Sequence, residues 1–366
     1  MQNTPLRVLE IVTVPLSMNG LALYPVRTAE RMDARVQVDF LAGSASPDLK
    51  ARIEKKGSRL FIAPSRMRAP IQYMRFVSKI VRENGYEVVH VHGNSCTMAV
   101  DLLACKLGGA RVRIAHSHNT SCRFQWANRL LRGLFQANCT HALACSEAAG
   151  RWLFRNRPFE VMQNAIDVQS FAPNAEVRAK VRSQYDSAKK ILLHVGNFSP
   201  EKNPLFLIDL IARLDESFVL WMVGDGALRA ETEKRAQEMH LASRIRFLGA
   251  RNDVPDFMQG ADALLLPSVY EGFPTVALEA QAAGLATLLS ENIAREVAFC
   301  DAAAFLPLNL EAWTHALQAL STASRNSSAQ AAAEALQKRG FDLNQSAKIL
   351  EEHYLHWAGR IQEEMP

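Results

Sequence analysis

The sequence predicts an α/β protein with two domains of similar organisation, each built on a parallel sheet. Three observations support this prediction. The chain has 366 residues, which is enough for two α/β domains. Short apolar runs recur in both halves and are typical of strands buried on both faces. The run at 261–266 leads through a loop into a helical pattern at 274–283, which ends at Gly284.

The composition is that of a globular protein kept in a reducing compartment. Hydrophobic residues make up 48% and charged residues 22% of the chain. We expect reduced thiols, because the six cysteines form no C-x-x-C pair or framework spacing. The apolar run near the N-terminus is too short for a signal peptide, and no stretch approaches the roughly 20 apolar residues of a membrane span. A cytoplasmic protein is expected.

Charge is distributed unevenly between the two halves. Residues 1–170 contain 23 Lys and Arg against 12 Asp and Glu, a net charge of +11. The whole chain carries +5, so residues 171–366 carry −6. The basic half could face an anionic lipid surface or a polyanionic acceptor, or its charge could be incidental. Nucleic-acid binding is not expected, because the basic half shows no recognised module.

The first half begins with three predicted strands and a helix. The strands are expected at 6–14, 36–41 and 59–63, with a helix beginning within 28–32. Two basic amphipathic segments follow, Arg66–Arg82 after Pro70 and Phe124–Phe135. Each could pack its apolar face on the core and leave its arginines in solvent, or could lie on an anionic membrane.

Two histidine pairs end predicted strands of this half. His90 and His92 occur in VVHVHG, and His116 and His118 occur in IAHSHNT. A period of two places each pair on one face of its strand, at the rim of a parallel sheet where α/β sites lie. Four histidines could hold zinc, but no cysteine or carboxylate in the sequence completes a clear ligand set. A buried structural role is the other alternative.

The second half repeats the pattern of strands and glycine-containing loops. Further strands are expected at 190–195, within 218–226 before its glycines, within 245–253 before a loop, and at 285–289. A loop with an exposed helix is expected at 322–337, and a last amphipathic helix at 343–360. The stretch 267–284 is central, because a strand here feeds a helix through the loop Tyr270–Phe273. Free N–H groups and the helix dipole make such a helix start an anion site, bracketed here by Glu271 and Glu279.

E-G-F-P-T-V-A-L-E, residues 271–279, resembles the E-x7-E signature of retaining glycosyltransferases of family 4. This resemblance implies the GT-B fold, in which two Rossmann-like domains face each other across a cleft and a C-terminal helix crosses back to the first domain. V-M-Q-N-A-I-D-V-Q-S-F resembles the family's connection between domains, although Ala165 replaces the usual glycine. The expected domains are an acceptor-binding domain at 1–165, a nucleotide-sugar-binding domain at 166–342 and a crossover helix at 343–366.

The resemblance also implies site residues. G-N-F-S-P-E-K resembles the family's G-R-x-x-x-x-K element, in which two cations meet the diphosphate; Lys202 matches, and Asn197 stands where the family has arginine. His118, with His116 as the second choice, matches the histidine that contacts the donor sugar. The implied catalytic residues are His118, Lys202 and Glu271. The implied donor-binding residues are Gly20, Gly196, Asn197, Lys202, Gly224, Arg251, Glu271, Gly272, Phe273, Pro274, Thr275 and Glu279.

The implied activity is transfer of a sugar, with retention, from a nucleoside-diphosphate sugar to a glycan or lipid-linked saccharide in surface polysaccharide biosynthesis. UDP-sugars are favoured as donors. No metal cofactor is expected, because the chain has no D-x-D to hold a divalent cation on the diphosphate. A peripheral position on the inner face of the plasma membrane would suit a lipid-linked acceptor. A non-catalytic nucleotide-sugar-binding subunit and a UDP-sugar epimerase of the same fold are the alternatives.

Overall fold

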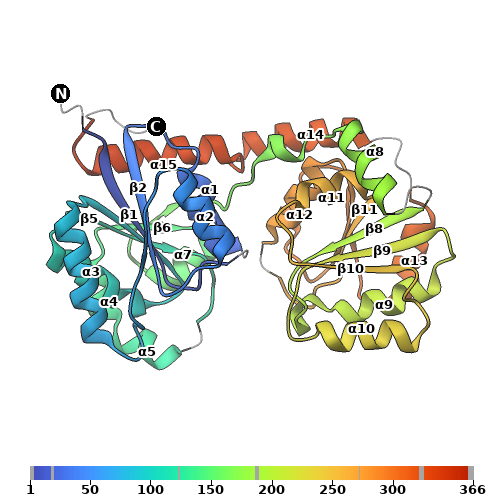
Figure 1. Ribbon diagram of the computed structural model, residues 1–366, viewed down its shortest axis with the longest axis horizontal. Coiled ribbons are helices and arrows are strands. Elements are labelled where there is room, and N and C mark those ends of the chain that lie inside the picture. Colours follow the sequence, from blue (N-terminus) through green and yellow to red (C-terminus); the bar gives the residue numbers. More distant parts are fainter. Residues whose placement is uncertain are drawn as a thin grey trace. The chain divides into compact units, whose positions relative to one another are not determined.

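The computed structural model describes residues 4–17, 20–122, 124–185, 189–271, 273–320 and 325–361. The chain forms two compact units. The first comprises Met1–Ala165 and Leu343–Pro366, and the second comprises Ile166–Asp342. Each unit is a parallel sheet with helices on both faces, which is a Rossmann-like arrangement (Figure 1).

The first unit contains a seven-stranded sheet in the order β3-β2-β1-β4-β5-β6-β7. Its strands are β1 (Leu6–Val12), β2 (Val36–Ala42), β3 (Leu60–Ile62), β4 (Val88–Gly93), β5 (Val112–Ser117), β6 (His141–Ala144) and β7 (Glu160–Val161). The strand order reverses between β1 and β4, where Glu10 pairs in register with His90 and Val12 with His92. The carboxyl ends of the strands beside such a reversal are where ligands bind in α/β sheets.

Two helical layers bury this sheet. One face packs on α1 (Gly20–Ala29), α2 (Pro47–Lys55) and the C-terminal helix α15 (Leu343–Trp357), which supplies Leu350 and Tyr354 to the core. The other face packs on α3 (Pro70–Asn84), α4 (Ala99–Gly108), α6 (Arg132–Asn138) and α7 (Glu147–Phe154). The last helix therefore belongs to the first unit although it follows the second in sequence, as the GT-B resemblance implies.

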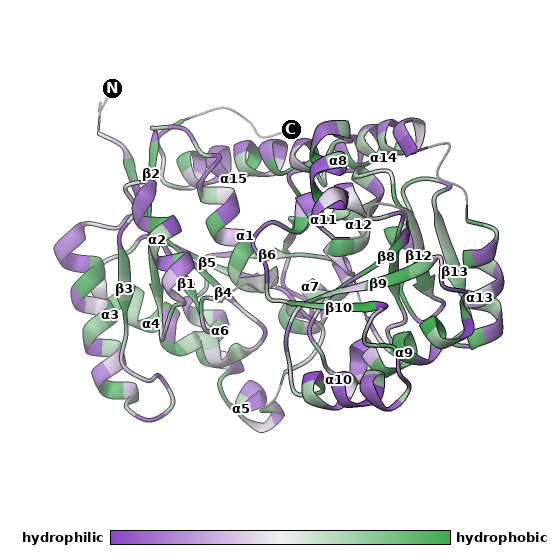
Figure 2. Ribbon diagram, turned by 45° about the vertical axis from the view of Figure 1, so that its right-hand side comes forward, coloured by the Kyte–Doolittle hydropathy of each residue, from purple (hydrophilic) through white to green (hydrophobic). Residues whose placement is uncertain are grey.

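The second unit contains a six-stranded sheet in the order β10-β9-β8-β11-β12-β13. Its strands are β8 (Lys190–Val195), β9 (Phe218–Val223), β10 (Ile245–Gly249), β11 (Ala263–Leu266), β12 (Ala286–Ser290) and β13 (Ala303–Leu306). β8, β9 and β11 are nearly continuous apolar runs, and Figure 2 shows these strands in the hydrophobic colour. Here the strand order reverses between β8 and β11.

The helices of the second unit also form two layers. One layer contains α8 (Ala175–Gln184), α11 (Val254–Gly260), α12 (Thr275–Ala282) and α14 (Arg325–Lys338). The other contains α9 (Pro204–Arg213), α10 (Arg229–Glu238) and α13 (Leu310–Gln318). Helix α10 buries only Thr232 and Ala236 among its ten residues, and Figure 2 shows it as mostly hydrophilic.

Three local expectations were wrong. The first helix occupies Gly20–Ala29 and ends where the sequence suggested a start, because Tyr24 and Val26 belong to the buried apolar face. The basic segment 66–82 could pack its apolar face on the core, but its apolar residue Ile71 is 67% exposed, while Tyr73, Val77 and Val81 of α3 are buried. The segment 124–135 is two short helices, α5 (Gln125–Leu130) and α6, and leaves Trp126 and Leu130 exposed.

All six cysteines are free thiols, in agreement with the sequence, and burial raises the pKa of Cys105 well above its usual value. Reactive thiolates require a lowered pKa, so this thiol is a packing residue. Among the residues that the structure describes, no helix has the length and apolar character needed to cross a membrane.

Candidate active site

The site of the second unit lies where its strand order reverses, at the carboxyl ends of β8 and β11. β8 leads into Gly196 and Asn197 and then into the short 3-10 helix Pro200–Lys202. β11 leads into Glu271 and the start of α12. The two loops are joined by a backbone hydrogen bond from Val269 N–H to the Glu201 carbonyl, 2.8 Å long.

Lys202 and Glu271 meet in this position. The Lys202 ammonium forms an ion pair with one Glu271 oxygen, and Ser268 Oγ lies 2.8 Å from the other. Both charged side chains are mostly but not fully buried, with 21% and 14% of their surface exposed. A partly accessible cation beside a carboxylate can exchange its partner for an anionic ligand, which a fully buried pair could not do.

The start of α12 provides a second group of donors. No side chain among the described residues caps this helix, whose N-cap position is Pro274. Ala277 N–H donates to the Pro274 carbonyl at 3.1 Å, so the first-turn N–H groups that we assign to an anion are those of Thr275 and Val276, with the helix dipole favouring negative charge there. Thr275 begins the helix, Phe273 stacks on Phe341 at 5.1 Å between ring centroids, and Glu279 is 8% exposed. Gly272 lies outside the described residues.

Glycine at 224 is required by packing. Gly224 has φ = +137°, and a Cβ there would lie 1.9 Å from the Gly196 carbonyl oxygen. Gly226 meets the Phe198 backbone in the same way, with the nearest atom 2.6 Å from an added Cβ. The G-D-G loop after β9 therefore fixes the loop that carries Gly196 and Asn197. Asn197 itself is exposed.

Two arginines lie near other parts of this site's loops. Arg251, expected at the nucleotide base, is held by Asp253 through bonds of 2.8 and 2.6 Å. Arg229, which sequence reasoning missed, places Nη1 3.4 Å from the Gly224 carbonyl and donates from Nε to Glu233. Arg229 is separated from Gly196 in the sequence by β9 and the loop that follows it, so only the fold brings the two residues to the same edge of the sheet. It is a candidate for the cation that Asn197 does not supply.

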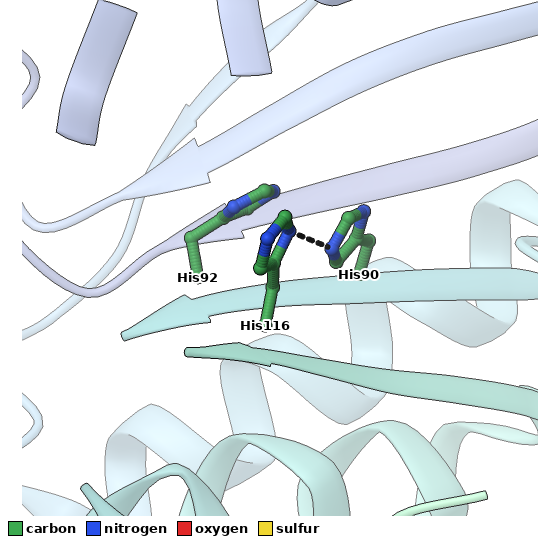
Figure 3. Close-up of side chains that lie close together, drawn as sticks. All are labelled: His90, His92 and His116. Carbon is green, nitrogen blue, oxygen red and sulfur yellow. Dashed lines mark hydrogen bonds between the residues drawn. The ribbon is translucent and has the colours of Figure 1, made fainter. Parts of the chain in front are cut away.

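The histidines of the first unit form a compact array. His90 and His92 lie on β4, and His116 and His118 lie at the end of β5, one strand away. Figure 3 shows the rings of His90, His92 and His116 gathered together. Ring centroids along each strand are 4.1 Å apart, and those across the strands are 5.2 Å (His90–His116) and 5.1 Å (His92–His118) apart. Three rings are fully buried, and His118 is partly exposed.

A buried carboxylate lies beneath this array. Glu10 on β1 is 2% exposed and lies 2.6 Å from His92 Nε2 through Oε2, while Oε1 accepts a hydrogen bond of 2.7 Å from the Tyr354 hydroxyl of α15. Burial opposes ionisation of Glu10, but the facing His90 and His92 rings hold the pKa of its carboxyl well below the usual range. Burial lowers the pKa of His92 to about 4 and that of His118 well below its usual value.

The array is built as a hydrogen-bonded chain. His92 Nδ1 lies 2.8 Å from His118 Nε2, and His90 Nε2 lies 3.2 Å from His116 Nδ1, so one proton bridges each facing pair. One nitrogen from each of His90, His92 and His116 lies within 4.8 Å of the others, which is close enough to hold a metal ion, but the nitrogens that face each other across the two strands lie within hydrogen-bonding distance of one another. Glu10 does supply the carboxylate that the sequence did not reveal beside the histidines, but one oxygen already accepts from the Tyr354 hydroxyl and the other lies 2.6 Å from His92 Nε2.

The predicted residues thus fall into two groups, one in each unit. Gly196, Lys202, Gly224, Glu271, Phe273, Pro274, Thr275 and Glu279 lie around the loops after β8, β9 and β11 and the start of α12, with Asn197 on the first of these loops. His118 and Gly20 belong to the first unit, where Gly20 begins α1. Sequence reasoning missed Glu10 and Tyr354, which are 344 residues apart and meet only through packing of α15.

Two Rossmann-like units with these sites define a protein of the GT-B class. Residues 18–170 match the family model described as Glycosyltransferase Family 4, and residues 177–335 match the one described as Glycosyl transferases group 1. EpsF of Bacillus subtilis, whose name places it among glycosyltransferases, is 35% identical over 317 residues, covering 81% of this chain and 82% of EpsF. The chain therefore belongs to this family of glycosyltransferases.

Other relatives agree with this assignment. The UDP-Gal:alpha-D-GlcNAc-diphosphoundecaprenol alpha-1,3-galactosyltransferase of Escherichia coli is 28% identical over 237 residues, covering 58% of this chain and 59% of that enzyme. The crystal structure of Anabaena HepE in complex with UDP-glucose superimposes with a TM-score of 0.79 at 17% identity, covering 95% of this chain and 98% of HepE. At that identity the likeness shows the fold alone.

Proposed function

We propose that this glycosyltransferase transfers a sugar from a UDP-sugar to a glycan or lipid-linked saccharide, with retention of anomeric configuration and without a metal ion. The observation that carries the proposal is the Lys202–Glu271 pair at the strand-order reversal of the second unit, beside the start of α12, which no side chain of the described residues caps. This combination offers a cation and free N–H groups to an anion, and a carboxylate to neutral hydroxyls.

Donor binding would exchange the partners of this pair. A diphosphate has more negative charge than one carboxylate, so it attracts the Lys202 ammonium and the N–H groups of α12 together. Glu271, released from Lys202, could then accept hydrogen bonds from the donor sugar, while Ser268 keeps its other oxygen in place. Glu279, further along α12, carries a carboxylate whose two oxygens could accept hydrogen bonds from the two ribose hydroxyls.

The same groups would stabilise the leaving diphosphate during transfer. Negative charge grows on the phosphate oxygen as the glycosidic bond breaks, and preorganised donors aimed at that charge lower the barrier. Lys202, the α12 N–H groups and Arg229 are the donors we assign to this task. Because they supply positive charge without a metal, we propose that activity persists in EDTA.

His118 is the residue of the first unit that we propose contacts the donor sugar. It is the partly exposed member of the histidine array, so a ligand can reach its ring. Retention would follow from attack of the acceptor on the face that the diphosphate leaves, with the leaving phosphate taking the acceptor proton.

The acceptor and pathway are proposed from the relatives. The Escherichia coli relative is named for a diphosphoundecaprenol-linked acceptor, and the Staphylococcus aureus relative CapH is named for capsular polysaccharide biosynthesis. We propose a role in surface polysaccharide biosynthesis at the cytoplasmic face of the membrane. The exposed apolar residues of 124–134 with Arg129 would provide the membrane contact.

The test is ligand-induced thermal stabilisation with UDP, GDP, ADP and their sugars, each with and without EDTA. We expect UDP and one of its sugars to raise the melting temperature equally in both conditions. Slow hydrolysis of the same donor would distinguish a transferase from a non-catalytic binding subunit. Folded protein that no nucleotide stabilises would refute the proposal, and stabilisation that EDTA removes would refute metal independence.

A further inference from the structure

In the array of histidines and Glu10, the positions of the protons decide which atom donates and which accepts in each hydrogen bond. Glu10 Oε2 lies 2.6 Å from His92 Nε2, and an imidazole ordinarily holds a proton more tightly than a carboxylate does, so we assign the proton of this bond to Nε2, with Glu10 as the acceptor. A neutral imidazole carries one proton, so His92 Nδ1 is then an acceptor. Its partner at 2.8 Å, His118 Nε2, must therefore be the donor.

The second oxygen of Glu10 belongs to a series of hydrogen bonds that does not include His118. Oε1 receives the Tyr354 hydroxyl proton, so the oxygen of Tyr354 accepts from His90 Nδ1, 2.6 Å away. This second arm ends at His116, whose Nε2 is buried without a hydrogen-bond partner among the described residues. Two series of hydrogen bonds, which we call arms, thus start at Glu10, and only the arm through His92 reaches His118.

We propose that Glu10 and His92 are positioning residues that hold His118 in the tautomer protonated at Nε2, leaving a lone pair on Nδ1. The atom of Asn164 that faces Nδ1 at 3.3 Å is the amide oxygen Oδ1, an acceptor, so this tautomer requires the Asn164 amide to be turned over, which places its N–H against the lone pair. The low pKa that burial gives His92 and His118 agrees with two neutral rings. If His118 contacts the donor sugar, which rests on the proposed function, it accepts a hydrogen bond from a hydroxyl rather than donating one.

The opposite set of proton positions also gives every hydrogen bond a donor and an acceptor, so the proposal can be tested against it. If Glu10 were protonated, it could donate to His92 Nε2, His92 Nδ1 would donate to His118, and His118 Nδ1 would donate to Asn164. Both arrangements use the same distances, so they differ only in the proton positions and in which atom of the Asn164 amide faces His118. Nitrogen chemical shifts of the rings report those positions directly and need no substrate.

The experiment is long-range 1H–15N NMR of the full chain labelled with 15N-histidine at pH 7.5, with the His118 signals assigned by their loss in His118→Asn. We expect a pyrrole-type Nε2 and a pyridine-type Nδ1 for His118. A pyridine-type Nε2, or two protonated nitrogens, would overturn the proposal without bearing on whether the protein is a glycosyltransferase.

Two variants separate the arms. Glu10→Met removes both acceptor oxygens at similar volume, and we expect His118 to become a mixture of tautomers. Tyr354→Phe is the matched control, because it removes only the arm that leads away, and His118 should keep its wild-type shifts. Unchanged His118 shifts in folded Glu10→Met, or equal changes in both variants, would show that the carboxylate does not act through His92. If Glu10→Met does not fold, His92→Phe makes the same break and is expected to give the same mixture.

Discussion

The ammonium of Lys202 forms an ion pair with the carboxylate of Glu271, although the two residues are 69 positions apart in the chain. They meet because β8 and β11 are neighbours at the point where the strand order of the second sheet reverses. The pair therefore combines a cation and a carboxylate at the place where α/β sheets bind their ligands.

Replacing each partner of this pair should have a different effect. Lys202→Met removes the cation for the diphosphate, so we expect loss of stabilisation by UDP and a fall in turnover of about 100- to 1000-fold. Glu271→Gln leaves Lys202 without its competing partner, so UDP should still stabilise the protein while turnover falls. Melting curves with UDP and initial rates of donor hydrolysis measure the two effects.

Lys234→Met is the control for charge removal. Lys234 lies on the exposed surface of α10 and pairs with Glu238 at 3.6 Å, in the same unit as Lys202. Such exposed pairs contribute little, so UDP binding and turnover should remain at wild-type values. A Lys202→Met protein that binds UDP as tightly as this control would contradict the assignment of Lys202 to the diphosphate.

The close approach of Gly224 to Gly196 gives a second prediction. Gly224→Ala requires a Cβ 1.9 Å from the Gly196 carbonyl oxygen at φ = +137°, so it should destabilise the protein by roughly 2–4 kcal/mol and weaken UDP binding. Gly133→Ala is the control, since an added Cβ meets no atom within 4 Å, and it should stabilise α6 by up to about 1 kcal/mol. Thermal denaturation compares the two; equal stability would show that the loops can separate without loss.

The sequence predicted the structure well where a local pattern of residues is compatible with few structures. Apolar runs such as 218–223 predict buried strands because they are short and rich in β-branched and aromatic residues, and the loop before α12 predicts an anion site from local geometry. The segment 124–135 misled because its apolar residues have helical spacing but do not share one environment: Trp126 and Leu130 face solvent, whereas Phe135 is buried. Periodicity identifies a face without saying what covers it.

The environment of the histidines could not be predicted in the same way. Glu10 is a single charged residue within an apolar run of the sequence. Its sequence neighbours do not indicate that two histidines and a tyrosine surround it in the structure. These contacts depend on strand order and on the return of α15, which are long-range features. A pairing of β1 with β4 places Glu10 opposite His90, and no sequence window contains both.

Stability should depend on pH through His194. Burial lowers the pKa of this ring from 6.5 to about 4, and Nδ1 lies 2.9 Å from the Leu265 carbonyl. The unfolded chain therefore binds more protons than the folded chain between pH 6.5 and 4, so stability falls as the pH is lowered through this window. A shift of this size corresponds to at most about 3 kcal/mol.

His194→Asn isolates that contribution. Asparagine can still donate to the Leu265 carbonyl but cannot be protonated, so the variant should lose less stability than wild type between pH 7.5 and 4.5. Other buried histidines, such as His92, titrate in both proteins and cancel in the difference. Denaturant unfolding at the two pH values measures it, and equal losses in both proteins would mean that His194 is not the group responsible.

The exposed apolar residues of α5 give the last prediction. Trp126 is 69% and Leu130 74% exposed, next to the exposed Arg129, a combination suited to the interface of an anionic membrane. Arg132 is less suitable for charge reversal, because its Nη1 donates to the Leu153 carbonyl at 2.8 Å and holds α6. We therefore expect Trp126→Ala and Arg129→Glu each to reduce binding to vesicles that contain phosphatidylglycerol.

Co-sedimentation with such vesicles, compared with phosphatidylcholine alone, measures this binding, which should weaken as salt screens the charge. Met239→Ala is the control, because Met239 is also an exposed apolar residue, at 38%, but belongs to the acidic second half. If wild type does not bind the anionic vesicles, or if all variants bind alike, the apolar residues of α5 serve another purpose. If only Trp126→Ala and Arg129→Glu lose binding, the first unit contacts the membrane through α5, as access to a lipid-linked acceptor requires.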